Sequence, residues 1–303
     1  MITPLHRAPK RNAARALIIL AGSFLGLALA GCANLSPSAA VAVAPAQTTV
    51  SVPVAQNLAG TATPPKSVIY IGNSFMYYNN SLHGHVGQLA RAAATNDKER
   101  ARHSAVSVTI SGSGLDWHDV ASYFRPDAVA RYSFLPNNDV RFNPPGSRLF
   151  DAAIMMDCSQ CPVHPRLHSV FFEYAKKHSQ TVRANGAEPI FMMTWAYADK
   201  PEMTQGLADA YGEAARQNNA FVIPVGLAFA RSVAAKPELN LYAPDKRHPS
   251  LAGTYLAANV VLASVFGVNP IGNSYTAELD AATARHLQEL AWQTVQAYKQ
   301  PAR

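Results

Sequence analysis

The sequence predicts an α/β fold in which a central parallel five-stranded sheet is covered by helices on both faces. From residue 67 onward, short apolar runs alternate with longer stretches whose apolar residues recur at helical spacing. The first short run, residues 68–71, is apolar throughout, as expected of a strand buried on both faces. About 235 of the 303 residues lie in this region, enough for one domain with a filled core.

Five apolar runs are expected to form the strands, and each leads into a helical stretch. In chain order, the strands are predicted at residues 68–71, 106–110, 152–156, 190–194 and 221–223. Helices are predicted at residues 82–95, 116–123, 168–184 and 204–217, briefly after 223, from 251 onward, and at about 277–298. Because every strand is followed by a helix, neighbouring strands are expected to run parallel.

The segment 124–149 interrupts this alternation between the second and third predicted strands. It contains four prolines and the adjacent pair Asn137 and Asn138. We interpret it as an irregular connection, because its length is unusual in a compact domain and its composition favours no regular element. It is either a loop that shapes a pocket or a surface excursion without a role.

A serine lies where the first predicted strand ends. Val68 to Ile71 is the strand, Gly72 permits a sharp turn, and Ser74 precedes the first helix. The carboxyl edge of a parallel sheet is where α/β folds bind ligands, so we expect Ser74 to be a nucleophile. A second Gly-Asn-Ser, ending at Ser274, follows Pro270 rather than a strand and is predicted to be a loop.

A base for this serine is expected near the C-terminus. Asp245 and His248 are three residues apart in Asp-Lys-Arg-His-Pro-Ser, just before a helical apolar run that Ser250 can cap. One short turn can present both side chains, so that the carboxylate fixes the imidazole tautomer while the other ring nitrogen takes the serine proton. The alternative is a turn-forming aspartate and an ordinary loop histidine.

These segments resemble the SGNH/GDSL hydrolase family over residues 67–266. The first block of the family is similar to Gly72-Asn73-Ser74-Phe75, and its last block to Asp245 through Ser250. Gly112, after the second strand, corresponds to the glycine of the second block. The resemblance implies a flavodoxin-like three-layer α/β/α architecture and an oxyanion hole formed by the backbone N–H groups of Ser74 and Gly112.

Two positions depart from the family pattern. Asn73 stands where the family usually has aspartate, and the third block, Gly-x-Asn-Asp, is absent. Asp157-Cys158-Ser159-Gln160-Cys161 follows the third strand instead. The amide of Gln160 or the hydroxyl of Ser159 could replace the missing asparagine amide in the oxyanion hole. An ionised Asp157 would repel an oxyanion, so no such role is assigned to it.

The cysteine pair has two interpretations. Cys158 and Cys161 could form a disulfide or remain free thiols in an exported protein. Together with His164 and His168 they also have a spacing close to that of structural zinc ligands, although a zinc finger usually separates its two ligand pairs by a longer run.

Residues 1–31 are predicted to be a lipoprotein signal peptide rather than part of the fold. A basic segment precedes an apolar run that is short for a membrane span, and Leu29-Ala30-Gly31-Cys32 resembles a lipobox. Cys32 is then the lipidated residue, and residues 32–66, rich in Ala, Pro, Ser and Thr, form a flexible tether. The alternative is a plain signal peptide or a membrane anchor.

The positive charge belongs partly to this export signal. The whole chain carries +7, and cleavage before Cys32 removes four basic residues and leaves +3. No stripe of Lys and Arg with interleaved aromatic residues is present, so nucleic acid is not expected as a partner. The expected location is the bacterial cell envelope, lipid-anchored, with Ala33 favouring the outer membrane.

The sequence thus predicts an envelope-anchored serine esterase in which Ser74 attacks, His248 transfers the proton and Asp245 orients His248. This chemistry needs no cofactor. The expected substrate is an ester, with acetylated or acylated carbohydrate as the first class to test. A non-catalytic binding module and an acyltransferase remain the alternatives, and the oligomeric state is left open.

Overall fold

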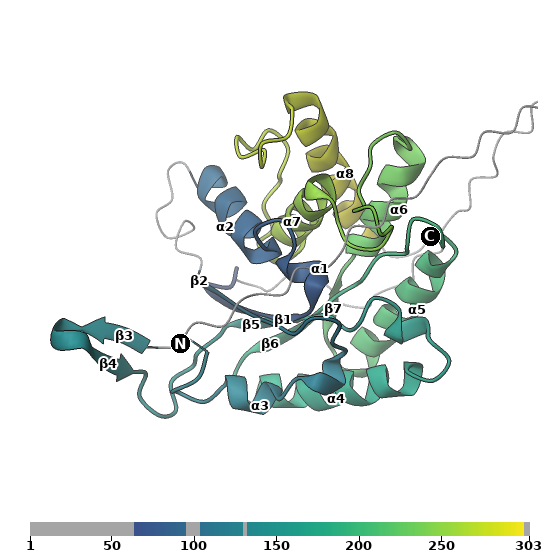
Figure 1. The fold of residues 1–303 in the computed structure, drawn as a ribbon. Coiled ribbons are helices and arrows are strands. Elements are labelled where there is room, and N and C mark those ends of the chain that lie inside the picture. Colours follow the sequence, from purple (N-terminus) through teal and green to yellow (C-terminus); the bar gives the residue numbers. More distant parts are fainter. Residues whose placement is uncertain (1–63, 95–103, 130–131, 300–303) are drawn as a thin grey trace, which may run out of the picture. The chain divides into compact units, whose positions relative to one another are not determined.

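The computed structural model describes residues 64–94, 104–129 and 132–299 (Figure 1). The predicted signal peptide, Cys32 and nearly all of the tether lie outside these residues. In the described ranges, no helix combines the length and the apolar character needed to cross a membrane.

A five-stranded parallel sheet forms the centre of the domain, as predicted. Its strands are β1 (Ser67–Gly72), β2 (Ser104–Thr109), β5 (Ala152–Met155), β6 (Glu188–Met192) and β7 (Phe221–Ile223). They are ordered β2-β1-β5-β6-β7, and all neighbouring pairs are parallel. The chain moves outward in opposite directions from β1 and β5, so the ends of these two strands form the switch point at which such sheets bind ligands.

Helices cover both faces of the sheet (Figure 1). One face carries α2 (Leu82–Ala93), α6 (Val225–Ala235), α7 (Leu251–Val265) and α8 (Ala281–Lys299). The other carries α3 (Val120–Tyr123), α4 (His168–Ala184) and α5 (Met203–Gln217). The three-layer architecture is therefore confirmed.

The apolar runs of the strands explain these layers. Val68 and Tyr70 of β1 belong to the core that includes α7, whereas Ile69 and Ile71 belong to the core on the opposite face. Successive side chains of a strand point to opposite faces, so an uninterrupted apolar run feeds both cores. Helix α7 is buried on every side, since only Leu251 among its residues is not buried, and most of its residues are apolar.

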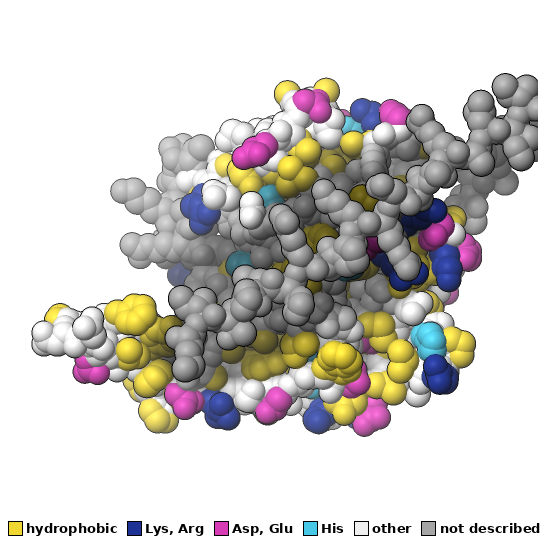
Figure 2. Space-filling view, in the orientation of Figure 1, with side chains coloured by type: hydrophobic (Ala, Val, Ile, Leu, Met, Phe, Trp, Pro, Cys, Tyr) yellow, Lys and Arg dark blue, Asp and Glu magenta, His cyan; other side chains and the backbone are white. Residues whose placement is uncertain are grey.

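The prediction of an irregular segment at 124–149 is wrong. It contains an antiparallel hairpin, β3 (Tyr132–Leu135) and β4 (Asp139–Phe142), joined by a 3₁₀ turn at Pro136–Asn138. Asn137 and Asn138 adopt φ values of 67° and 61°, which asparagine tolerates and hairpin turns require. Aromatic residues are the feature of this segment that favours strands. Tyr132, Phe134 and Phe142 form an exposed aromatic face on the hairpin, where Figure 2 shows yellow side chains.

Candidate active site

Ser74 lies at the carboxyl end of β1, as the sequence predicted. The strand ends at Gly72, Asn73 caps a single helical turn, α1 (Ser74–Tyr77), and Ser74 is its first residue. The side chain of Ser74 is largely buried, with 7% of the residue exposed. Because the N–H groups of a first helical turn have no partners within the helix, the backbone of Ser74 can donate to a ligand.

Asn73 connects three segments of the chain around this serine. Its amide oxygen accepts from the N–H of Phe75 at 3.2 Å. Its amide nitrogen donates to the carbonyl of Ser113 at 2.9 Å and to that of Asp157 at 3.1 Å. An aspartate has no hydrogen to donate to two carbonyl groups, so these contacts explain why this chain has asparagine where the family usually has aspartate.

The loop between α6 and α7 carries the predicted base. One oxygen of Asp245 accepts the N–H groups of Arg247 and His248, each at 3.0 Å. The other oxygen contacts Nδ1 of His248. Directly after the loop, the hydroxyl of Ser250 caps α7 by accepting from the N–H of Gly253 at 3.2 Å. Asp245 therefore stabilises the turn through its backbone N–H groups and also orients the imidazole ring of His248.

Ser74 and His248, 174 residues apart, meet at this edge of the sheet. Nε2 of His248 lies 2.8 Å from Oγ of Ser74. Burial acts to raise the pKa of Asp245, but hydrogen bonds from the imidazole and from two backbone N–H groups lower it to about 2. The ionised carboxylate can only accept, so Nδ1 of His248 carries the hydrogen, and in the neutral form of the ring Nε2 can accept from the serine.

Aromatic rings surround the imidazole of His248. Tyr78 stacks on it, with ring centroids 4.3 Å apart and planes 8° apart. Phe75 meets it edge-on at 5.5 Å. Behind Phe75 lies Trp195, stacked at 4.3 Å, whose indole N–H donates to the carbonyl of Arg247 at 2.9 Å. The roles of Tyr78 and Phe75 were not predicted from the sequence, because their ring contacts depend on a loop that lies far away along the chain.

The three predicted oxyanion donors differ in their surroundings. Gly112 has φ of 74°, a conformation that favours glycine, and no hydrogen bond of the described residues uses its N–H or that of Ser74. The loop that contains Gly112 is held by the bond from Asn73 to the carbonyl of Ser113. Gln160 is exposed, and among the described residues no hydrogen bond joins its amide to Ser74 or His248.

The carbonyl group of Gly72 is held by several hydrogen bonds directly before the turn that carries Ser74. The carbonyl of Gly72 accepts from the N–H of Ile110 at 3.0 Å and from the hydroxyl of Ser113 at 3.2 Å. Nε2 of His118 lies 3.1 Å from the same oxygen, and Tyr123 contacts its Nδ1. Burial lowers the pKa of His118 to about 4, so the ring is neutral near neutral pH. The peptide before Asn73 is thereby fixed in orientation.

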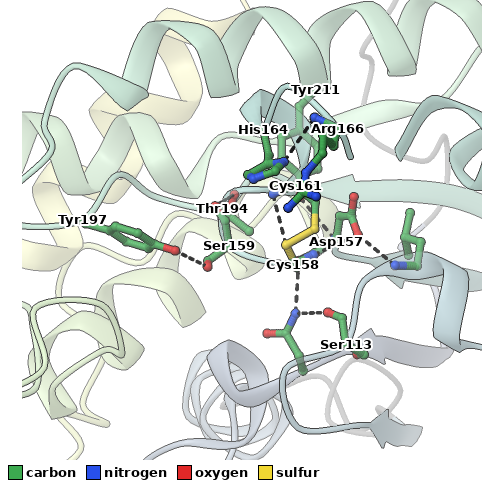
Figure 3. Close-up of a disulfide and its surroundings, with 12 residues drawn as sticks. Ser113, Asp157, Cys158, Ser159, Cys161, His164, Arg166, Thr194, Tyr197 and Tyr211 are labelled. Atoms are coloured by element: carbon green, nitrogen blue, oxygen red, sulfur yellow. Dashed lines mark hydrogen bonds between the residues drawn. A yellow bond between two sulfur atoms is a disulfide. The ribbon is translucent and has the colours of Figure 1, made fainter. Parts of the chain in front are cut away.

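The cysteine pair is a disulfide, so the zinc alternative is wrong for this structure. Cys158 and Cys161 are joined by their sulfur atoms (Figure 3). Thiols in a disulfide cannot ligate zinc as thiolates. Among the residues that the structure describes, no cluster of three or more His, Cys, Asp or Glu side chains suits a metal ion. His164 and His168 contact the backbone at Arg166 and Pro162 instead.

Asp157 lies directly before this disulfide, at the end of β5. Its carboxylate accepts the N–H groups of Leu115 and Cys158, each at 2.8 Å. Burial raises its pKa to about 6, and these two N–H groups only partly oppose the effect. Ser159, inside the disulfide loop, bonds through its hydroxyl to that of Tyr197 at 2.7 Å (Figure 3). The missing third block is thus replaced by a cross-linked loop anchored to both the first and second blocks.

Comparison with known proteins gives structural matches only. No family model matches the chain, and no curated protein matches it. The chain is similar to a solved DUF4886 family protein from Bacteroides uniformis, at 17% identity and a TM-score of 0.53, covering 78% of this chain and 96% of that one. This likeness shows the fold. It is consistent with the sheet and helix order described above.

SGNH and esterase structures are also among the neighbours. One is a proposed SGNH hydrolase from Slackia heliotrinireducens, at 21% identity and a TM-score of 0.47, covering 65% of this chain and 97% of that one. Another is the psychrotrophic esterase EstA from Pseudoalteromonas sp., at 11% identity and 0.44, covering 67% and 97%. These two matches are weak, and the reaction has to be inferred from the residues of this chain's own site.

Proposed function

We propose that this chain is a serine esterase whose nucleophile is Ser74. The observation that carries the proposal is the 2.8 Å contact between Oγ of Ser74 and Nε2 of His248, with Asp245 on the other ring nitrogen. A neutral imidazole with a free Nε2 can accept the serine proton as the oxygen attacks an ester carbonyl. The buried setting of Ser74 limits competing contacts with water.

The reaction then follows from the groups around the serine. The attack places negative charge on the carbonyl oxygen, which the N–H groups of Ser74 and Gly112 can stabilise. His248 returns its proton to the leaving alcohol, and an acyl-Ser74 remains. His248 next accepts a proton from water, whose oxygen attacks the acyl group. The bond from the acyl carbon to Oγ of Ser74 then breaks, the acid leaves, and His248 returns the proton to Oγ. Each step uses only groups of this chain and water.

The test is turnover of p-nitrophenyl acetate by the wild type and two serine variants. S74A should lose at least about a thousandfold in kcat, since the nucleophile is removed. S274A changes the exposed serine of the second Gly-Asn-Ser copy and should match the wild type. A wild type without activity on any ester, or an active S74A, would contradict the proposal.

The substrate and location are also proposed. We expect an O-acyl or O-acetyl group on a carbohydrate, presented near a membrane to which Cys32 anchors the protein through lipid. Expression in a Gram-negative host with an alkyne analogue of palmitate tests the anchor, because label should be found on the wild type and absent from C32A.

Addition of a sugar acceptor to the esterase assay separates hydrolysis from acyl transfer, since transfer yields an acylated sugar rather than free acid.

A further inference from the structure

We infer that Tyr78 is a positioning residue for the His248 imidazole and that its aromatic face favours the charged form of that ring during the reaction. This inference rests on the esterase function proposed above and goes beyond the three residues assigned to it. The two rings are parallel within 8° and their centroids are 4.3 Å apart. Phe75 bounds the imidazole from a second direction, edge-on.

The ring contact restricts how the imidazole can turn. A histidine held only by Asp245 keeps one hydrogen bond while its ring tilts, and Nε2 then moves away from Ser74. Tyr78 lies against the whole face of the ring and opposes that tilt. When Nε2 takes the serine proton the ring becomes a cation, and a cation over an aromatic face is stabilised by the ring's quadrupole. The contact is therefore stronger in the charged intermediate than in the resting site.

Tyr78 is tied to the nucleophile by the backbone. It follows α1 directly, and its N–H donates to the carbonyl of Ser74 at 3.2 Å. The next residue, Asn79, donates through its side-chain amide to the carbonyl of Pro249 at 3.0 Å and to the hydroxyl of Thr254 at 2.8 Å. Pro249 follows His248 directly. Two adjacent residues thus join the serine segment to the histidine segment.

The backbone after Tyr78 is unusual in a way that fits this role. Asn79, Asn80 and Ser81 have φ values of 51°, 66° and 69°, three consecutive residues in the left-handed region. Such conformations cost energy for residues other than glycine and persist where surrounding contacts impose them. Here Nε2 of His85 lies 2.6 Å from the carbonyl of Asn79, and its Nδ1 lies 2.8 Å from the hydroxyl of Tyr275. The turn that presents Tyr78 is therefore held from both sides.

The experiment compares Y78L, Y78F and a matched control, Y132L, which removes an exposed tyrosine ring from the hairpin. The steady-state kinetics of ester hydrolysis are measured for each. Y78L should lose about tenfold in kcat and keep KM within about twofold of the wild type. The reason is that the variant leaves substrate binding unchanged but no longer stabilises the charged His248 ring of the intermediate. Y78F keeps the ring and should stay within about threefold of the wild type. Y132L should match the wild type.

A second readout separates positioning from simple loss of structure. The proton between Nδ1 of His248 and Asp245 should give a far-downfield resonance in the proton spectrum, present in the wild type and Y78F and broadened in Y78L at equal urea midpoints. T254V, which removes one partner of Asn79 and leaves the ring in place, should lower kcat several-fold, and it serves alone if Y78L does not fold.

The outcomes keep the two proposals apart. A wild type that hydrolyses no ester counts against the esterase itself. An active wild type whose Y78L and T254V variants keep full kcat, or whose Y78F variant falls as far as Y78L, overturns the role of the Tyr78 ring and leaves the esterase standing.

Discussion

The side-chain amide of Asn73 donates to the backbone carbonyl of Asp157, 84 residues later, at 3.1 Å. The same nitrogen donates to the carbonyl of Ser113. This one side chain therefore holds the ends of β1, β2 and β5 in a fixed relation beside Ser74.

N73D restores the residue that the related family usually has and should nevertheless damage this protein. The variant places carboxylate oxygens against two carbonyl oxygens, so buried acceptors face each other without hydrogen. We expect a loss of about 3 kcal/mol in the free energy of unfolding, together with reduced kcat. Urea denaturation measures the first. N269D, which alters an exposed asparagine that uses only its side-chain oxygen, is the control and should be neutral.

D245N should leave the fold intact and suppress catalysis. The amide can present its NH₂ group to Nδ1 of His248, which favours the tautomer with hydrogen on Nε2, and that nitrogen can no longer accept from Ser74. We expect kcat to fall by two to four orders of magnitude. D199N removes a neighbouring exposed carboxylate paired with Lys246 and should keep its activity. Equal kcat values for D245N and D199N would show that Asp245 has no catalytic part.

Asp157 predicts a pH dependence of stability. Burial raises its pKa in the folded chain to about 6, from 3.8, so between these values the folded protein holds a proton that the unfolded chain has released. The stabilisation is complete below the unfolded pKa and is lost as pH rises through about 6. The loss amounts to about 3 kcal/mol at most.

D157N removes this titration. Urea midpoints measured from about pH 4.5 to about pH 7.5 should show the wild type losing stability relative to D157N as pH rises. Both proteins share every other titrating group, so the difference isolates Asp157. Parallel curves would mean that the carboxyl group is not perturbed in this way.

The disulfide should stabilise the loop that replaces the third block. In C158S/C161S we expect the free energy of unfolding to fall by about 2 kcal/mol, the value for a short closed loop. Thiol titration of the unfolded wild type, before and after reduction, should reveal the bonded pair. Added zinc should leave the melting temperature of the oxidised protein unchanged. A zinc-dependent rise would restore the metal interpretation of Cys158, Cys161, His164 and His168.

The sequence predicted the elements whose signals are local. The apolar run from Val68 to Ile71 gave β1, and His168–Ala184 was predicted with the bounds observed, followed by Gly186 at φ of 74°. The fourth strand was predicted two residues late, at 190–194, whereas β6 spans Glu188–Met192 and includes Pro189. The hairpin was missed because its two turn asparagines were interpreted as signs of irregular structure.

The candidate site was predictable only in part, for the same reason. Ser74, Asp245 and His248 stand in recognisable local contexts, and the structure brings all three together. The donors of Asn73 and the ring of Tyr78 depend on partners in distant segments, which no local pattern identifies. Three consecutive polar residues at 79–81, just before a helix, were the available sign of an unusual turn.

Whether Ser74 is the nucleophile can be measured from the mass of the intact protein after reaction with a fluorophosphonate, followed by peptide mapping. We expect a single adduct on Ser74, formed by the wild type and S274A and absent from S74A. Formation of the adduct should slow strongly in H248A, because the serine then lacks its base. An adduct on another residue, or a wild type that never reacts while a known serine esterase in the same tube does, would contradict it.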